Sequence, residues 1–279
     1  MADYSWAVPV MRAGYAGRGV TYLAVAGISL WAIWRGGDAE GTSSVIDTLG
    51  GSAWGVVVLW IIGLGLIAYA IWRGLAAVED LEDYGTEAKG LVARAGMVVS
   101  GLVHGALGAA ALGTALRGGG GEDGSGGGVS AAVSTVLGWP GGRWLLLAAA
   151  LCTIGAGLYY AHKGIAAKYR DKLAANAFTT RYDLVLRAGV VAQGVVILII
   201  GGFLGSAALN GNAEEAGGLD RVFDWLANQP FGNVLVVALC LGLLGFAFFC
   251  FVNAAYRIVA RVSGGDVSSL AASLRARVT

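Results

Sequence analysis

The chain has 279 residues, of which 57% are hydrophobic and 13% are charged, and its formal net charge is +1. Soluble globular chains carry about 25% charged residues, so water cannot be the solvent for most of this surface. A net charge this small gives no strong field for nucleic acid, and no nucleic-acid partner is predicted.

Six continuous apolar stretches follow one another along the chain, and each is long enough to cross ~30 Å of hydrocarbon as a helix. The predicted transmembrane helices cover residues 14–34, 54–76, 95–116, 143–165, 186–209 and 232–257. Helix is the expected state because backbone polar groups in lipid need partners within the same segment. A β-barrel is rejected because the stretches do not alternate between apolar and polar residues.

The connections between these stretches are polar. The glycine-rich run over 118–128 is interpreted as a flexible linker, because it lacks the Lys-Ser/Thr of a phosphate-binding loop. The acidic cluster over 79–87 is interpreted as a solvated connection, with binding of a divalent cation or a basic partner as alternatives. In the C-terminal tail, 261–279, apolar residues at helical spacing from Val267 to Val278 favour a helix on the anionic leaflet.

Lysine and arginine are distributed unevenly about the predicted spans. Of the 19 basic residues, 15 lie on the side of the N-terminus, the second and fourth connections and the C-terminal tail. Basic residues accumulate on the cytoplasmic side of membrane proteins. The sequence therefore predicts a multi-pass protein with both termini in the cytoplasm.

The motif Arg-Ala-Gly-x-x-x-x-Gly occurs three times, each time at the start of an odd-numbered span. Its residues are Arg12, Gly14 and Gly19; Arg94, Gly96 and Gly101; and Arg187, Gly189 and Gly194. The even spans align without a gap from Gly65, Gly155 and Gly242. The units cover 1–80, 88–170 and 181–260 and enter the membrane from the same side. We therefore expect an all-α integral membrane protein of three parallel two-helix repeats, with pseudo-threefold symmetry along the membrane normal.

Glycines in membrane helices let a neighbouring backbone approach closely, so the motif glycines are expected to serve packing. The three motif arginines are interpreted as anchors at the lipid headgroups, with lipid binding or a role in holding the units together as alternatives. The motif, together with Gly-Leu-x-x-Tyr-Ala-x-Trp-Arg from Gly65 to Arg73, resembles the bacterial membrane family catalogued as domain of unknown function 1206. The resemblance covers about residues 10 to 260. It implies the repeat architecture and a bacterial plasma (inner) membrane location, and it supplies no activity. The third unit departs most, with Cys250 where the first has Arg73 and the second Lys163.

Polar residues within the spans are few. Positions four apart share a helix face. The first motif glycine of each unit is therefore followed on its own face by polar side chains: Arg18 and Tyr22 after Gly14, Ser100 and His104 after Gly96, and Gln193 after Gly189. The candidate contacts for a polar pathway or a ligand are Arg18, Tyr22, Ser100, His104 and Gln193. Packing hydrogen bonds or, for Arg18, contact with headgroups are the alternatives. The three cysteines, Cys152, Cys240 and Cys250, lie in apolar runs and are expected to be small buried hydrophobic residues, and no metal site is predicted.

No catalytic set and no cofactor site are predicted. The leading hypothesis is a non-enzymatic membrane protein that binds membrane lipids or a partner protein as a structural or accessory factor, with a homo-oligomer also possible. The alternative is a channel or small-solute transporter with a path at the pseudo-threefold axis. An enzyme is the third class and the least favoured.

Overall fold

The computed structural model describes residues 4–117, 128–260, 262 and 269–276. Within these ranges, six helices are long and apolar enough to cross a membrane. They are α1 (Ala7–Trp34), α3 (Ala53–Val78), α4 (Ala88–Arg117), α6 (Gly142–Ile165), α8 (Asp183–Asn210) and α10 (Gly232–Tyr256). The prediction of an all-α multi-pass membrane protein is confirmed. Helices α1, α4 and α8 begin before the predicted spans, so each motif arginine lies inside a helix rather than at its start.

Each repeat also contains a short helix in the connection between its two spans, where none was predicted. These helices are α2 (Thr42–Gly50), α5 (Gly128–Leu137) and α9 (Leu219–Ala227), and each leads by a tight turn into an even-numbered span. A Cβ atom built on Gly55, Gly142 or Gly232 would lie 2.0, 1.7 or 2.1 Å from a carbonyl oxygen of the short helix. Glycine is therefore required at the same turn of all three units. Most of the predicted glycine-rich linker, residues 118–127, lies outside the described residues.

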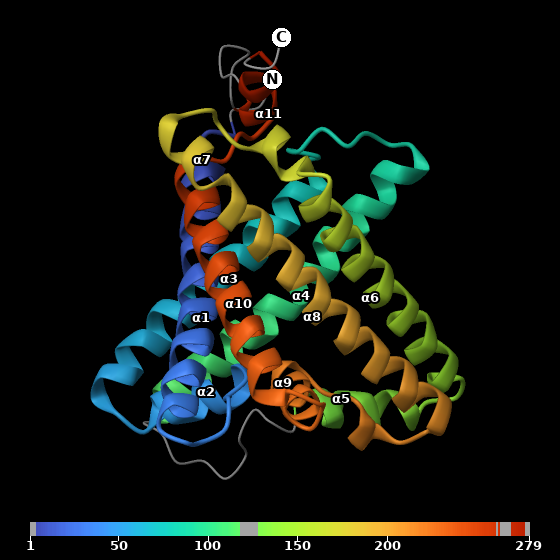
Figure 1. The fold of residues 1–279 in the computed structure, drawn as a ribbon. Helices are drawn as coiled ribbons and strands as arrows, with labels where there is room; N and C mark the ends of the chain where they lie inside the picture. Colours follow the sequence, from blue (N-terminus) through green and yellow to red (C-terminus); the bar gives the residue numbers. More distant parts are fainter. Residues whose placement is uncertain (1–3, 118–127, 261, 263–268, 277–279) are drawn as a thin grey trace.

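The long helices pack in chain order. Helix α1 packs against α3, α3 against α4, α6 against α8, α8 against α10, and α10 against α1 (Figure 1). The pair that would complete the ring, α4 and α6 of the second repeat, is missing from the helix pairs that pack extensively. In the most apolar windows of α4 and α6, 22% and 17% of the residues are buried, against 39% to 50% in the other four helices. The helices thus form an incomplete ring, and the predicted pseudo-threefold symmetry is not confirmed.

The surroundings of the first glycine of each motif show how the helix packing of repeat 2 differs from that of repeats 1 and 3. A Cβ atom on Gly14 would lie 2.6 Å from Cα of Tyr69 on α3, and one on Gly189 would lie 2.4 Å from the backbone nitrogen of Phe246 on α10. A Cβ atom on Gly96 would meet nothing within 4 Å. The same residue therefore closes a helix pair in repeats 1 and 3 and faces open space in repeat 2.

The second glycine of each motif instead contacts the preceding unit. Gly19 lies against the ring of Phe251 on α10, Gly101 against Ala70 on α3, and Gly194 against the backbone of Ala161 on α6. In all three repeats, the second glycine therefore lies against the even helix of the preceding unit. The interruption of the ring is confined to the inside of repeat 2.

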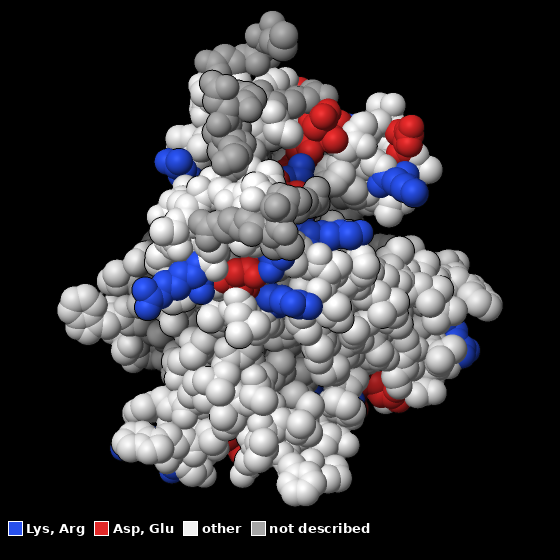
Figure 2. All heavy atoms as spheres, turned by 45° about the horizontal axis from the view of Figure 1, so that its top comes forward, with Lys and Arg blue, Asp and Glu red and all other residues white. Residues whose placement is uncertain are grey.

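The two ends of the bundle differ. Helices α2, α5 and α9 lie at one end, and α7 (Ala177–Arg181) and α11 (Leu270–Arg275) lie at the other, where α1 begins (Figure 1). We call the latter the charged end, because charged side chains gather over it while the surface below is mostly uncharged (Figure 2). It is the end predicted to face the cytoplasm.

The described part of the C-terminal tail packs on the protein itself. Leu270 is fully buried, and its N–H donates to the carbonyl of Leu173 over 2.8 Å. Leu270 thus faces the protein, and the predicted helix on the leaflet stays a prediction, because Val267 and Val278 lie outside the described residues. Among the cysteines, Cys240 and Cys250 are buried but Cys152 is exposed on the flank of α6, contrary to expectation.

Candidate functional site

Arg18 lies inside the ring, where α1 faces α3 and α10. Only 4% of its surface is exposed, and its Nη1 donates to the hydroxyl of Tyr69 over 3.0 Å. Its Cζ lies 4.9 Å from the ring centre of Phe246 and 5.7 Å from that of Tyr22. The hydroxyl of Tyr22 in turn accepts a 3.0 Å hydrogen bond from Nε2 of Gln193 on α8. Three of the five predicted contacts therefore form one connected group.

The other two predicted contacts join this group through Tyr69. The ring centres of Tyr69 and His104 are 4.8 Å apart, and Nδ1 of His104 lies 2.7 Å from the carbonyl oxygen of Ser100. This distance fits an Nδ1–H that donates to the carbonyl, so His104 is engaged within its own helix. The structure thus brings the side chains of four candidates together, with Ser100 contributing its backbone carbonyl, and the residue that links them, Tyr69, was not among the predicted contacts.

Two further cations lie against the tyrosines that surround Arg18, and from the sequence they were expected only to set the topology. Arg73 on α3 has its Cζ 5.6 Å from the ring centre of Tyr69, and Lys163 on α6 has its Nζ 5.7 Å from that of Tyr160. Tyr160 also interacts with Arg18 and Arg73. We call Arg18, Arg73 and Lys163 the cation cluster. The signal that could have found it was the alignment of Arg73 with Lys163 at one position of the repeat.

The cation cluster has no carboxylate of its own among the described residues. The Nε atoms of both arginines are buried and have no hydrogen-bond partner in the described part of the chain. The sole acidic residue within the six long helices is Asp183, at the start of α8, and its carboxylate pairs with Arg170. Burying a cation is costly unless a counter-charge and hydrogen bonds compensate for lost water. The cluster is therefore an electropositive site suited to an anion.

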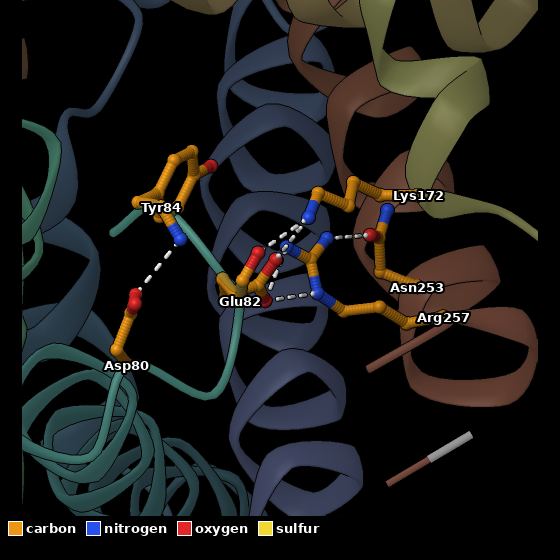
Figure 3. Close-up of polar contacts among 6 residues, drawn as sticks. All are labelled: Asp80, Glu82, Tyr84, Lys172, Asn253 and Arg257. Carbon is orange, nitrogen blue, oxygen red and sulfur yellow. Dashed lines mark hydrogen bonds and ion pairs between the residues drawn. The ribbon is translucent and has the colours of Figure 1, made fainter. Parts of the chain in front are cut away.

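Next to the cluster, the connections that follow the three even helices meet at one carboxylate (Figure 3). Glu82 follows α3, Lys172 follows α6, and Arg257 follows α10. Oε1 of Glu82 accepts from Nε and Nη2 of Arg257 over 3.1 and 2.8 Å, and Oε2 lies 3.4 Å from Nζ of Lys172. Arg257 Nη1 also donates to the side chain of Asn253 over 2.7 Å. We call Glu82, Lys172 and Arg257 the Glu82 triad.

The electrostatics of the triad keep Glu82 ionised. Burial of its side chain, which is fully enclosed, opposes the charge. The guanidinium of Arg257 and the ammonium of Lys172 outweigh burial and hold the pKa of the Glu82 carboxyl below its ordinary value. Arg73 of the cation cluster also favours the ionised carboxyl, so the single negative charge of Glu82 is shared among Arg257, Lys172 and Arg73 and cannot neutralise all of them.

This arrangement corrects the interpretation of residues 79–87 as a solvated connection. Glu82 is 1% exposed and Asp80 6% exposed. The Asp80 carboxylate accepts from the backbone N–H groups of Tyr84 and Gly85, each over 2.8 Å, and so fixes the turn that points Glu82 inward. A run of acidic residues in a connection does not reveal which member is buried.

Two of the three motif arginines link neighbouring repeats. Arg94 donates to the carbonyls of Ala77 and Val78 over 2.6 and 3.0 Å, and Arg187 donates to the carbonyl of Ile165 over 2.7 Å. Each satisfies carbonyl groups that the last turn of the preceding even helix leaves unpaired. Arg12, the third, is exposed. The alternative in which these residues hold the units together thus accounts for Arg94 and Arg187.

The chain is similar to an uncharacterized protein of Bacillus subtilis (strain 168), YxxB. The two are 26% identical over 256 residues, which cover 90% of this chain and 92% of the Bacillus protein. No solved structure matches the chain. The model of the family described as Domain of Unknown Function (DUF1206) matches three segments, residues 13–80, 95–167 and 188–257, one in each repeat. The chain therefore belongs to this family, as its repeated motif predicts.

Proposed function

We propose that this protein is a membrane-embedded binding protein, without enzymatic activity of its own, whose cation cluster holds an anionic group near the charged end. The observation that carries the proposal is Arg18: it is almost fully buried among membrane-spanning helices, and no carboxylate among the described residues pairs with it. Arg73 and Lys163 add two more positive charges around the same tyrosines. An anion of two or more oxygens matches the fork of N–H donors on a guanidinium.

The chemistry around the cluster supports binding rather than catalysis. Its other members are the phenols of Tyr22, Tyr69 and Tyr160, which supply hydroxyl groups and ring faces for cations. The nearby imidazole of His104 already has one ring nitrogen engaged with a carbonyl of its own helix. These groups can position an anion without a nucleophile–base pair.

The proposal is tested with protein purified in a neutral detergent. The midpoint of thermal unfolding is measured against inorganic phosphate and against water-soluble dihexanoyl phosphatidic acid, at constant ionic strength. We expect at least one of the two probes to raise the midpoint, because a ligand that binds only the folded state stabilises it. The increase should shrink in Arg18→Gln and in Lys163→Gln, of which the second replaces the less buried side chain and so preserves the fold.

Lys89→Gln is the matched control, because Lys89 is an exposed cation at the start of α4. It should respond to both probes as the wild type does. The proposal fails if neither probe raises the midpoint above the effect of chloride. It also fails if Lys163→Gln responds like the wild type.

A further inference from the structure

We infer that the anionic group is the headgroup of a phospholipid, which enters the ring laterally between α4 and α6. The inference rests on the proposed function, because it names the source of the anion at the same cation cluster. We call the space between these two helices the open side.

At the open side the two neighbouring helices do not pack extensively, unlike the other neighbouring pairs of the ring, and small residues mark both of its walls. A Cβ atom on Gly96 of α4 or on Gly155 of α6 would meet nothing within 4 Å. The residues at the same repeat positions in unit 1 are in close contact: Gly14 lies against the backbone of Tyr69, and Gly65 against Gly17. The second repeat thus keeps the glycines of a closed helix pair but leaves room between its helices.

The side chains beside these glycines suit an acyl chain. On α4, Val92, Val99 and Val103 are spaced with Gly96 on one helical face and are 73%, 60% and 53% exposed. On α6, Leu151 and Leu158 are one turn to either side of Gly155 and are also exposed. An apolar tail can lie here at no cost in desolvated polar groups.

Two of the three cations, Lys163 and Arg73, lie at the depth of a headgroup and next to the open side. Lys163 is two residues before the end of α6 and Arg73 five residues before the end of α3. At 1.5 Å per residue, both Cα atoms are within about 8 Å of the helix ends. The would-be Cβ of Gly101 on α4 lies 3.3 Å from Cβ of Arg73, which places Arg73 behind the α4 wall, while Lys163 belongs to the α6 wall. Basic groups between membrane helices on the cytoplasmic side are a recurrent means of binding anionic headgroups.

Charge complementarity decides between the possible occupants. Free inorganic phosphate satisfies the cations but leaves the apolar walls of the open side unused. A second copy of this chain covers the walls but brings the same positive cluster with it. An anionic phospholipid satisfies both features at once, with its phosphate toward Arg73, Lys163 and Arg18 and its tails between the helices.

The test is native mass spectrometry of the protein in neutral detergent, titrated with dioleoyl phosphatidylglycerol or with dioleoyl phosphatidylcholine. We expect the anionic lipid to bind at least about tenfold more tightly than the zwitterionic one. Gly96→Leu and Gly155→Leu should each weaken binding of phosphatidylglycerol by about tenfold, because they fill the open side without touching a cation. Gly27→Leu, at an exposed glycine of α1 that also meets nothing within 4 Å, is the matched control and should bind as the wild type does.

The inorganic-phosphate titration is repeated on the same variants, and thermal unfolding confirms that each is folded. If the leucine variants lose phosphatidylglycerol but keep their response to phosphate, the inference is supported. If phosphate stabilises the wild type but phosphatidylglycerol binds no better than phosphatidylcholine, the inference is overturned while the proposed function stands. If no anionic probe binds, both fail. A wild-type dimer that Gly96→Leu converts to a monomer would assign the open side to a second copy and overturn the inference.

Discussion

Repeats 1 and 3 are closed helix pairs, whereas repeat 2 is open, although all three carry the same glycine motif. Gly14 and Gly189 hold α1 against α3 and α8 against α10 at distances that exclude any side chain. Gly96 occupies the same position and faces open space. A glycine therefore permits close approach of two helices without enforcing it.

The second repeat differs from the third in a cation near the end of its even helix. Repeat 2 contributes Lys163 at the position where repeat 3 has Cys250, and Lys163 shares its surroundings with Arg73 of repeat 1. Closing α6 onto α4 would bury these like charges more deeply, which is unfavourable without an anion between them. The third repeat has no cation at this position and is closed, but repeat 1 has Arg73 there and is closed as well, so a cation at this position does not by itself keep a helix pair apart.

The largest effect is expected at the Glu82 triad, which ties the end of the open repeat to the ends of the two closed ones. Glu82→Gln removes the carboxylate that Arg257 and Lys172 share. It should lower the free energy of unfolding by about 3–5 kcal/mol, the cost of leaving a buried charge without its partner. Thermal or denaturant unfolding in detergent measures the loss.

Hydrogen exchange of Glu82→Gln compares the local stability of repeat 2 with that of repeat 3. Repeat 2 lacks packing between its own helices, so exchange should increase more over residues 163–173 than over residues 246–256 of α10. Glu87→Gln, which neutralises an exposed carboxylate of the same connection, should change neither quantity. Equal loss of protection in both segments would show that repeat 2 is held as firmly as repeat 3.

A smaller change in stability is expected from alanine substitutions at the first glycine of each motif, and it should differ between the repeats. Gly14→Ala and Gly189→Ala place a methyl group against backbone atoms, so each should cost about 1–3 kcal/mol of stability. Gly96→Ala places it in open space and should be neutral or stabilising by up to about 1 kcal/mol, because alanine favours the helix. Unfolding of the three variants in one detergent gives the ranking. A penalty at Gly96 equal to the other two would mean that α4 and α6 close in the membrane.

The sequence predicts the spans and the repeats because they depend on local pattern: continuous apolar runs, and a motif that recurs in one chain. It also predicts Arg18, Tyr22, Ser100, His104 and Gln193 as one group, because helical spacing places them on inward faces.

The sequence cannot show that Arg73 and Lys163 belong to that group, since an arginine near a helix end serves as a headgroup anchor equally well. The burial of Glu82 is equally hidden, because it depends on Lys172 and Arg257, which come from two other repeats. The sequence pattern cannot predict the open side either, because Gly96 and Gly14 stand in identical motifs.

The smallest effect is the pH dependence that Glu82 imposes on the joined ends of the repeats. Its pKa is lowered by folding, because Arg257 and Lys172 favour the carboxylate more than burial opposes it. A carboxyl with a lowered folded-state pKa binds protons more readily when unfolded, so its contribution is complete above its ordinary value of 4.5 and is lost as the pH falls through the folded-state value. The midpoint of thermal unfolding should therefore be insensitive to Glu82 from about pH 7 to about pH 5 and should begin to fall only below 4.5. Glu82→Gln should be less stable throughout and should lack this component, so the difference between wild type and variant narrows on acidification. A difference that stays constant to about pH 4 or widens there would show that the carboxyl is not held ionised by the triad, and that the ends of the three repeats are joined by other contacts.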